Sequence, residues 1–241
     1  MFKHKAILII HGFAGGVYDE EYLANFLEVK RDFDVFSFTL PGHDVKDKRS
    51  ATEEKWIEES ENQLKLLIKR GYKTIYLIGH SMGGVIATHL AKKYNSVKRV
   101  VLVAPAFTSI ASDEEGGIIS ALFKIPDLIK AYSYKEILTR VNKLPISSEK
   151  EFFKLVDNYK DEIYELDIPV LFVHGTVDQL VPTKSSIEIY EKLKNDKKKL
   201  LLIKDYYHDV FKGDKVDAIC LEIQKFLSIK ERKIKKEKIE L

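Results

Sequence analysis

The 241-residue chain contains a single cysteine, Cys220, and this scarcity excludes several classes of protein. An internal disulfide needs two cysteines, and a Cys-x-x-Cys metal or redox site needs two that lie close together in sequence. Cys220 lies in a C-terminal segment whose apolar residues recur with helical spacing, which predicts a buried core thiol and not a reactive one. Disulfide-stabilised folds and Cys-x-x-Cys sites are therefore ruled out.

Long hydrophobic runs are also missing. The longest, residues 6–10 and 100–106, are far shorter than the roughly 18 residues that a membrane span requires. The first five residues carry charge, but the apolar run after them is short and has no small-residue cleavage site, so it is not typical of a secretory signal. We therefore expect a cytoplasmic protein with no stable membrane insertion.

The chain has little excess charge of either sign. Its 40 Lys and Arg residues and 37 Asp and Glu residues leave a formal net charge of +3. Residues 230–241 hold six basic and three acidic side chains, so this charged tail accounts for the whole excess. The neutral remainder argues against nucleic-acid binding. The tail could touch an anionic membrane or RNA, but we expect it to be a solvated, frayed helix end.

What the chain does have is a regular alternation of short apolar runs and amphipathic segments. With 45% hydrophobic and 32% charged residues it is too apolar for disorder, and its length suits one domain. The apolar runs predict strands at 5–10, 34–40, 73–79, 97–104, 168–174 and 199–203. Helical spacing covers 17–30, 52–71, 82–94, 184–194 and 215–229. This pattern predicts an α/β fold, a six-stranded, mostly parallel sheet with helices on both faces.

One long stretch, residues 105–166, interrupts this alternation. It contains no predicted strand, and residues 116–129 and 152–156 have the pattern of short helices. Two parallel strands need only one crossover helix, so the surplus predicts a helical cap over the carboxyl edge of the sheet. We expect residues 1–104 and 167–229 to form the core domain around this cap insertion.

The motif Gly79-His80-Ser81-Met82-Gly83-Gly84 lies where an apolar strand gives way to a helix. The pattern G-x-S-x-G alone often occurs by chance. The preceding strand, the following helix and the additional glycine favour a nucleophile elbow over an ordinary glycine turn. In such an elbow the serine adopts a strained backbone, and glycines flank it where a Cβ would clash.

A serine nucleophile needs a base to take its proton and a carboxylate to orient that base. His208 follows the strand 199–203 and Asp178 follows the strand 168–174, so both lie at the carboxyl edge where sites form in open α/β sheets. The order Ser81, Asp178, His208 is the one expected for a nucleophile elbow on such a sheet. These three residues are the predicted catalytic triad.

The other histidines and acids of the chain fit these roles less well. His4 precedes the first strand, His89 lies within a helix, and His80 is the variable residue of the elbow, so these three are poor bases. The remaining candidates, His11, His43 and His174, end strands or enter loops, where they line the pocket or bond loop backbones. Among the acids, Asp167 precedes its strand, while Asp205 and Asp209 crowd His208 in sequence.

Attack on a carbonyl also requires donors for the negative oxygen that forms, usually two backbone N–H groups. Met82, one residue past the nucleophile, supplies the first in this type of elbow. The loop His11-Gly12-Phe13-Ala14-Gly15-Gly16 should supply the second, and Phe13 is placed to donate. The same glycines do not form a phosphate cradle, because the Lys-Ser/Thr of a P-loop and the spacing of a dinucleotide motif are missing.

Together, His11-Gly12-Phe13, the elbow at 79–84, His174-Gly175 with Asp178, and Tyr207-His208 resemble the α/β-hydrolase superfamily over nearly the whole chain. The Pro41-Gly42-His43 turn is similar to that of small bacterial carboxylesterases and monoacylglycerol lipases. The resemblance implies hydrolysis of short or medium acyl esters through an acyl-serine intermediate, with no metal or organic cofactor. We expect a small acyl ester as the partner and a monomer or homodimer.

The acyl chain would be received by apolar side chains of the cap, or these side chains form the core of the cap itself. The candidates are Ile118, Ile119, Leu122, Phe123, Ile125 and Leu128. Thioester, lactone and carbon–carbon hydrolysis use the same triad and stay open, as does a non-catalytic ligand receptor on this fold. Haloalkane and epoxide chemistry employs a carboxylate nucleophile in this superfamily, and Ser81 argues against both.

Overall fold

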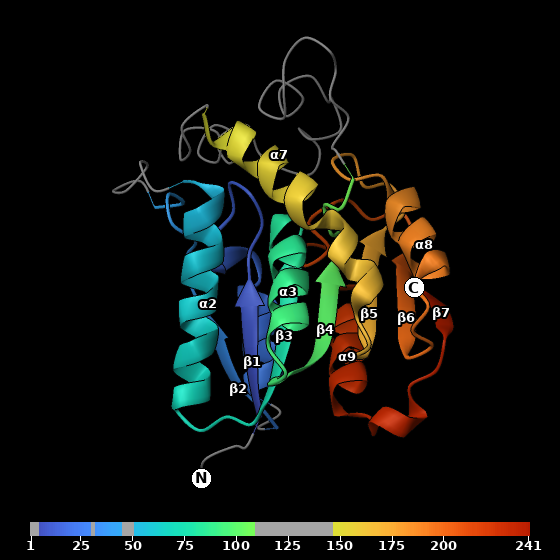
Figure 1. The fold of residues 1–241 in the computed structure, drawn as a ribbon. Coiled ribbons are helices and arrows are strands. Elements are labelled where there is room, and N and C mark those ends of the chain that lie inside the picture. The colour runs from blue at the N-terminus through green and yellow to red at the C-terminus, as the bar shows by residue number, and fades with distance from the viewer. Residues whose placement is uncertain (1–4, 30–31, 45–50, 109–146) are drawn as a thin grey trace.

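The computed structural model describes residues 5–29, 32–44, 51–108 and 147–241. In these residues seven parallel strands form one sheet in the order β2-β1-β3-β4-β5-β6-β7 (Figure 1). The strands are β1 (Lys5–Ile10), β2 (Asp34–Ser37), β3 (Thr74–His80), β4 (Val97–Val103), β5 (Val170–Gly175), β6 (Lys198–Ile203) and β7 (Glu237–Glu240).

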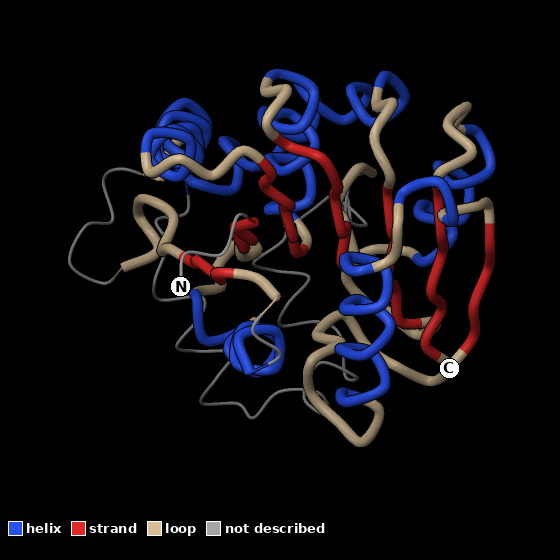
Figure 2. The backbone as a smooth tube through the Cα atoms, turned by 90° about the horizontal axis from the view of Figure 1, so that it is seen from below, coloured by secondary structure: helices blue, strands red, loops and turns tan. Residues whose placement is uncertain are grey.

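Helices cover both faces of the sheet (Figures 1 and 2). The α-helices are α1 (Glu21–Val29), α2 (Glu53–Lys69), α3 (Met82–Lys93), α7 (Ser147–Tyr159), α8 (Thr183–Lys192) and α9 (Val216–Ser228). The short 3₁₀ helices are η1 (Val17–Asp19), η3 (Lys160–Glu165) and η4 (Glu231–Lys233). One core packs the sheet against α2, α3, α7 and α8, and the other packs it against α1 and α9. The α/β fold predicted from the sequence is confirmed.

Local sequence explains where these elements begin and end. Successive side chains of β1 alternate between the two cores, as in Ile7 and Leu8, which is why an unbroken apolar run forms a strand here. Helix α2 begins after Thr52, whose side-chain oxygen accepts the Lys55 N–H at 3.4 Å. It stops before Gly71, which has a φ of 94°.

Two predicted elements differ from the structure. The helix expected over 17–30 is divided into η1 and α1. The tail expected as a frayed helix end instead contains β7, paired in parallel with β6, so the sheet has one strand more than predicted. Ile234 is buried and Ile239 packs against the core on the α9 side, while Glu191 binds both Lys236 and Lys238. Backbone pairing with β6 and ion pairs with Glu191 therefore order the tail. Its sequence is too polar for a strand to be predicted there.

Of the predicted cap, the structure describes residues 105–108 and 147–166. Helix α7 contains the predicted helical segment 152–156 and packs on α2 and α3. The predicted helix at 116–129 and all six acyl-pocket candidates lie outside the described residues. Within the described part of the chain, no helix is both long enough and apolar enough to span a bilayer.

The sheet order places a topological switch point at the carboxyl ends of β1 and β3. From β1 the chain continues to β2 on one side, and the next strand, β3, lies on the other side. Loops leave in opposite directions at such a switch point, and binding sites form there. Because Ile10 pairs with Gly79, the loop after β1 lies directly beside the turn after β3.

Candidate active site

Ser81 occupies the tight turn between β3 and α3. Its φ of 52° and ψ of −117° are a strained backbone conformation for a residue with a side chain. The turn is held by its own neighbours, because the Ser81 carbonyl accepts the N–H groups of Gly84 at 3.0 Å and Ala106 at 3.2 Å. A strained residue that is held in place by several hydrogen bonds is typical of a nucleophile elbow, which the motif predicts.

The glycines of the motif are sterically required. A Cβ on Gly79 would lie 2.2 Å from the carbonyl oxygen of Gly83, and a Cβ on Gly83 would lie 2.1 Å from that of Ile10. Both distances are far below any real carbon–oxygen contact. The start of α3 can therefore pack against the ends of β1 and β3 only with glycine at these positions.

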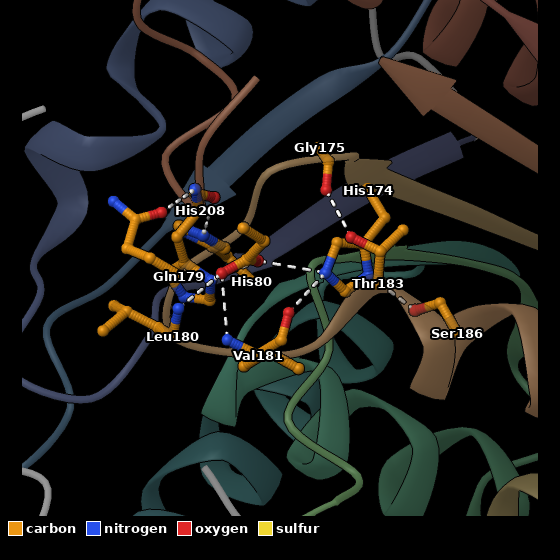
Figure 3. Close-up of polar contacts among 10 residues, drawn as sticks. His80, His174, Gly175, Gln179, Leu180, Val181, Thr183, Ser186 and His208 are labelled. Atoms are coloured by element: carbon orange, nitrogen blue, oxygen red, sulfur yellow. Dashed lines mark hydrogen bonds and ion pairs between the residues drawn. The ribbon is translucent and has the colours of Figure 1, made fainter. Parts of the chain in front are cut away.

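Asp178 and His208 meet, although their loops follow different strands. His208 Nδ1 donates to Asp178 Oδ2 at 2.7 Å, and the N–H groups of Leu180 and Val181 donate to Oδ1 at 2.8 and 2.9 Å (Figure 3). Burial alone would raise the pKa of the Asp178 carboxyl. The charge of His208 and hydrogen bonds from His174 and His208 outweigh burial and hold that pKa well below its ordinary range.

His208 lies close to the elbow, because it contacts His80, the residue before Ser81. The His80 Nε2–H donates to the His208 carbonyl at 3.3 Å. The centroids of the two imidazole rings are 5.1 Å apart, and the angle between the ring planes is 31°. Within the described residues no hydrogen bond joins the Ser81 hydroxyl to the His208 ring. Such bonds commonly tighten only when substrate binds. Since Nδ1 of His208 is engaged by Asp178, Nε2 is the ring nitrogen left for a further hydrogen bond.

The loop after β1 lies against the elbow. A Cβ on Gly12 would be 3.0 Å from the Ser81 Cβ, a tight contact, so glycine favours this close approach. His11 stabilises the loop, because its Nδ1–H donates to the Gly12 carbonyl at 2.8 Å and its Nε2 accepts the Leu40 N–H at 2.9 Å. Among the described residues, neither the Phe13 nor the Met82 amide donates to another protein group.

The side chain of Phe13 connects this loop to the described part of the predicted cap. The centroid of its ring lies 5.3 Å from the ring centroid of Phe152 on α7 and 6.2 Å from the ring centroids of Trp56 and His43. Trp56 in turn donates from Nε1 to the Pro41 carbonyl at 2.9 Å. Helix α7 is thereby packed on the residue whose amide is the predicted second oxyanion donor.

His174 and Glu20 lie near the triad and make contacts that the sequence does not predict. His174 was expected to line the pocket or bond a loop backbone. It does approach the Val181 carbonyl, but it also contacts Asp178 directly. Glu20 was not singled out. It is buried behind the elbow and accepts a hydrogen bond from His80 Nδ1 at 2.7 Å. The four-residue spacing of His174 and Asp178 was an available signal, whereas nothing local marks Glu20.

The described residues contain no group of three or more His, Cys, Asp and Glu side chains able to hold a metal ion. Cys220 is buried in α9, as predicted, and burial raises the pKa of its thiol to about 12. A thiol in that state is a core side chain and not a nucleophile.

Comparison with known proteins places this arrangement in a family. A model for the alpha/beta hydrolase fold matches residues 5–118, and one for serine aminopeptidase, S33, matches residues 114–215. A carboxylesterase of Bacillus subtilis (strain 168) is 22% identical over 227 residues, 92% of each protein. A thermostable monoacylglycerol lipase of Bacillus sp. (strain H-257) is 25% identical over 214 residues, 84% of this chain and 82% of that protein. The crystal structure of a Paleococcus ferrophilus monoacylglycerol lipase matches with a TM-score of 0.72 and 22% identity, covering 93% of this chain and 94% of the other.

The parallel sheet, its strand order, the elbow and the matching family models define the class: the chain belongs to the α/β-hydrolase superfamily. Within that superfamily it is similar to small carboxylesterases and monoacylglycerol lipases.

Proposed function

We propose that the protein is a serine hydrolase that cleaves carboxylic esters of short to medium acyl chains, with Ser81, Asp178 and His208 as its catalytic triad. The observation that carries the proposal is the strained Ser81 elbow together with the 2.7 Å hydrogen bond from His208 to a buried Asp178 carboxylate. The relatives named carboxylesterase and monoacylglycerol lipase support the same class of substrate.

In the proposed reaction the Ser81 oxygen attacks the ester carbonyl carbon while His208 Nε2 takes the hydroxyl proton. The backbone N–H groups of Phe13 and Met82 receive the oxyanion, and loss of one such donor costs about 2.7 to 4 kcal/mol. His208 then returns the proton to the leaving alcohol. Water repeats the sequence on the acyl-serine and releases the carboxylic acid.

Asp178 has a defined task in this scheme. It is ionised at neutral pH, because its pKa is held low by the contacts described above. It accepts from Nδ1 of His208 and therefore fixes the tautomer that leaves Nε2 free as the base. It also stabilises the imidazolium that forms when His208 takes the proton.

The remaining expectations from the sequence belong to the same proposal. Residues 105–166 would form the cap, supported by the packing of Phe152 on Phe13. The apolar residues expected in the cap would receive the acyl chain. We also propose a cytoplasmic, monomeric or homodimeric enzyme that needs no metal or organic cofactor.

The triad is tested by comparing two serine variants in hydrolysis of a p-nitrophenyl ester. Ser81→Ala should lower kcat by roughly a thousandfold or more, as loss of a nucleophile does in other serine hydrolases. Ser96→Ala is the matched control, because its buried hydroxyl has no hydrogen-bond partner among the described residues. The control should stay within about twofold of the parent. Equal activity of the Ser81 variant and the parent would remove the proposed mechanism.

The substrate class is tested with a panel graded by acyl length and leaving alcohol, with one thioester and one lactone included. We expect the highest kcat/KM for an ester of short or medium acyl length. A higher kcat/KM for the thioester or lactone would make that compound the proposed substrate class in place of the ester. The proposed triad would be unaffected.

A further inference from the structure

His174 is a buried residue that the proposed reaction does not use. It lies near the carboxyl end of β5, four residues before Asp178, and its side chain is fully inaccessible to solvent. Its Nε2 is 3.0 Å from Asp178 Oδ2 and 3.0 Å from the Val181 carbonyl oxygen, and its Nδ1 is 2.7 Å from Ser186 Oγ on α8 (Figure 3).

These contacts assign the hydrogen of the neutral imidazole. The carbonyl and the ionised carboxylate can only accept, so Nε2 carries the hydrogen and shares it between these two acceptors. Nδ1 then accepts from the Ser186 hydroxyl, which satisfies every polar contact of the ring. Ser186 is itself fully buried, so its hydroxyl contacts Nδ1 without competition from solvent.

The Asp178 carboxylate consequently receives four hydrogen bonds. Two backbone N–H groups donate to Oδ1, and the imidazoles of His174 and His208 both donate to Oδ2. Rotation of the carboxylate would break several of these bonds at once. Each donor also withdraws negative charge from the oxygens, so His174 moderates how strongly Asp178 attracts a protonated His208.

We infer that His174 is a positioning residue: by sharing Oδ2 with His208 it fixes the orientation of the Asp178 carboxylate, and Ser186 holds the His174 ring in place through Nδ1. This inference rests on the proposed function, because it assigns His174 a role through the proposed triad. A purely structural His174 would connect β5 to α8 without influencing His208.

The inference is tested with His174→Phe, which keeps a ring and removes the donor, and His174→Gln, whose amide can restore one donor. The phenylalanine variant should lower kcat on a p-nitrophenyl ester about ten- to a hundredfold, as expected when a catalytic group loses its fixed position. KM should change little, because Asp178 does not bind substrate. The glutamine variant should recover part of the loss.

The pH profile gives the readout that a structural role would not move. With one donor fewer, Asp178 stabilises the His208 imidazolium more strongly, so the acid limb of kcat/KM should move to higher pH. The other charged or titratable groups around His208 are His80 with Glu20 behind it, and Asp209 with its partner Lys212. None of them is altered in these variants.

A second readout does not depend on activity. The His208 proton donated to Asp178 should give a low-field ¹H NMR signal, which His174→Phe and Ser186→Ala should both displace. Ser186→Ala leaves the imidazole in place and serves if the phenylalanine variant fails to fold. Ser185→Ala is the matched control, because its buried hydroxyl has no partner among the described residues and it should leave the signal unmoved.

Unchanged kcat, pH profile and low-field signal in folded His174→Phe would overturn the inference, and so would an equal displacement by Ser185→Ala and Ser186→Ala. If the parent protein hydrolysed no ester, the proposed function would fail, and the NMR comparison would still decide whether His174 controls the contact between Asp178 and His208.

Discussion

His80 and Glu20 form a buried ion pair directly behind His208. Burial raises the pKa of Glu20 from 4.5 to about 7, against the opposing influence of His80. Burial alone would lower the pKa of His80, but the hydrogen bond and charge of Glu20 raise it from 6.5 to about 9. Both nitrogens of His80 face acceptors, Glu20 and the His208 carbonyl, which also favours the protonated ring.

These shifts predict how stability depends on pH. The contribution of Glu20 is complete below pH 4.5 and is lost as pH rises through about 7, and that of His80 is complete below 6.5 and lost through about 9. The pair should therefore make the free energy of unfolding fall between pH 5 and 9. In Glu20→Gln this dependence should be weaker, as measured by urea unfolding at pH 5, 7 and 9.

The exposed neighbour Glu21 provides the control for this experiment. Glu21→Gln makes the same substitution outside the buried pair and should retain the pH dependence of the parent. If Glu20→Gln and Glu21→Gln showed the same dependence as the parent, the pair would not be the source of the effect.

At the scale of the elements, the C-terminal segment completes the sheet. Strand β7 pairs with β6, and its register brings Ile239 opposite Leu201. Ile234, just before the strand, is 4% exposed and belongs to the core shared with α1 and α9. The surface charges of β7 contribute less, because exposed ion pairs such as those with Glu191 are screened by water.

Ile234→Ala should therefore lower the free energy of unfolding by about 2 kcal/mol or more, the usual cost of truncating a buried isoleucine. The adjacent Lys235 is exposed, and Lys235→Ala should stay within about 0.5 kcal/mol of the parent. Chemical denaturation of the two variants measures both values. Equal stability of the two variants would show that the segment is not anchored through its apolar side chains.

At the scale of the whole molecule, the six apolar strands and the elbow could be predicted because their signals are local. Unbroken apolar runs predict buried parallel strands, and glycines at fixed spacing predict the turn at Ser81. The meeting of Asp178 and His208 could also be predicted, since parallel strands end at the same edge of the sheet.

Features that depend on distant partners could not be predicted in the same way. Strand β7 has one apolar residue, Ile239, and it forms because β6 offers a backbone to pair with. The contact between His80 and Glu20 joins residues 60 positions apart. The shared oxygen of Asp178 depends on the side-chain geometry of His174, which sequence spacing alone does not define.

The central claim is that Ser81 is the activated nucleophile of this fold, and the most direct measurement is the site of covalent labelling by a fluorophosphonate. The account predicts one adduct per chain on the peptide that contains Ser81, lost in Ser81→Ala and strongly slowed in His208→Ala. Labelling at another serine, or equal labelling of the Ser81 variant, would contradict it.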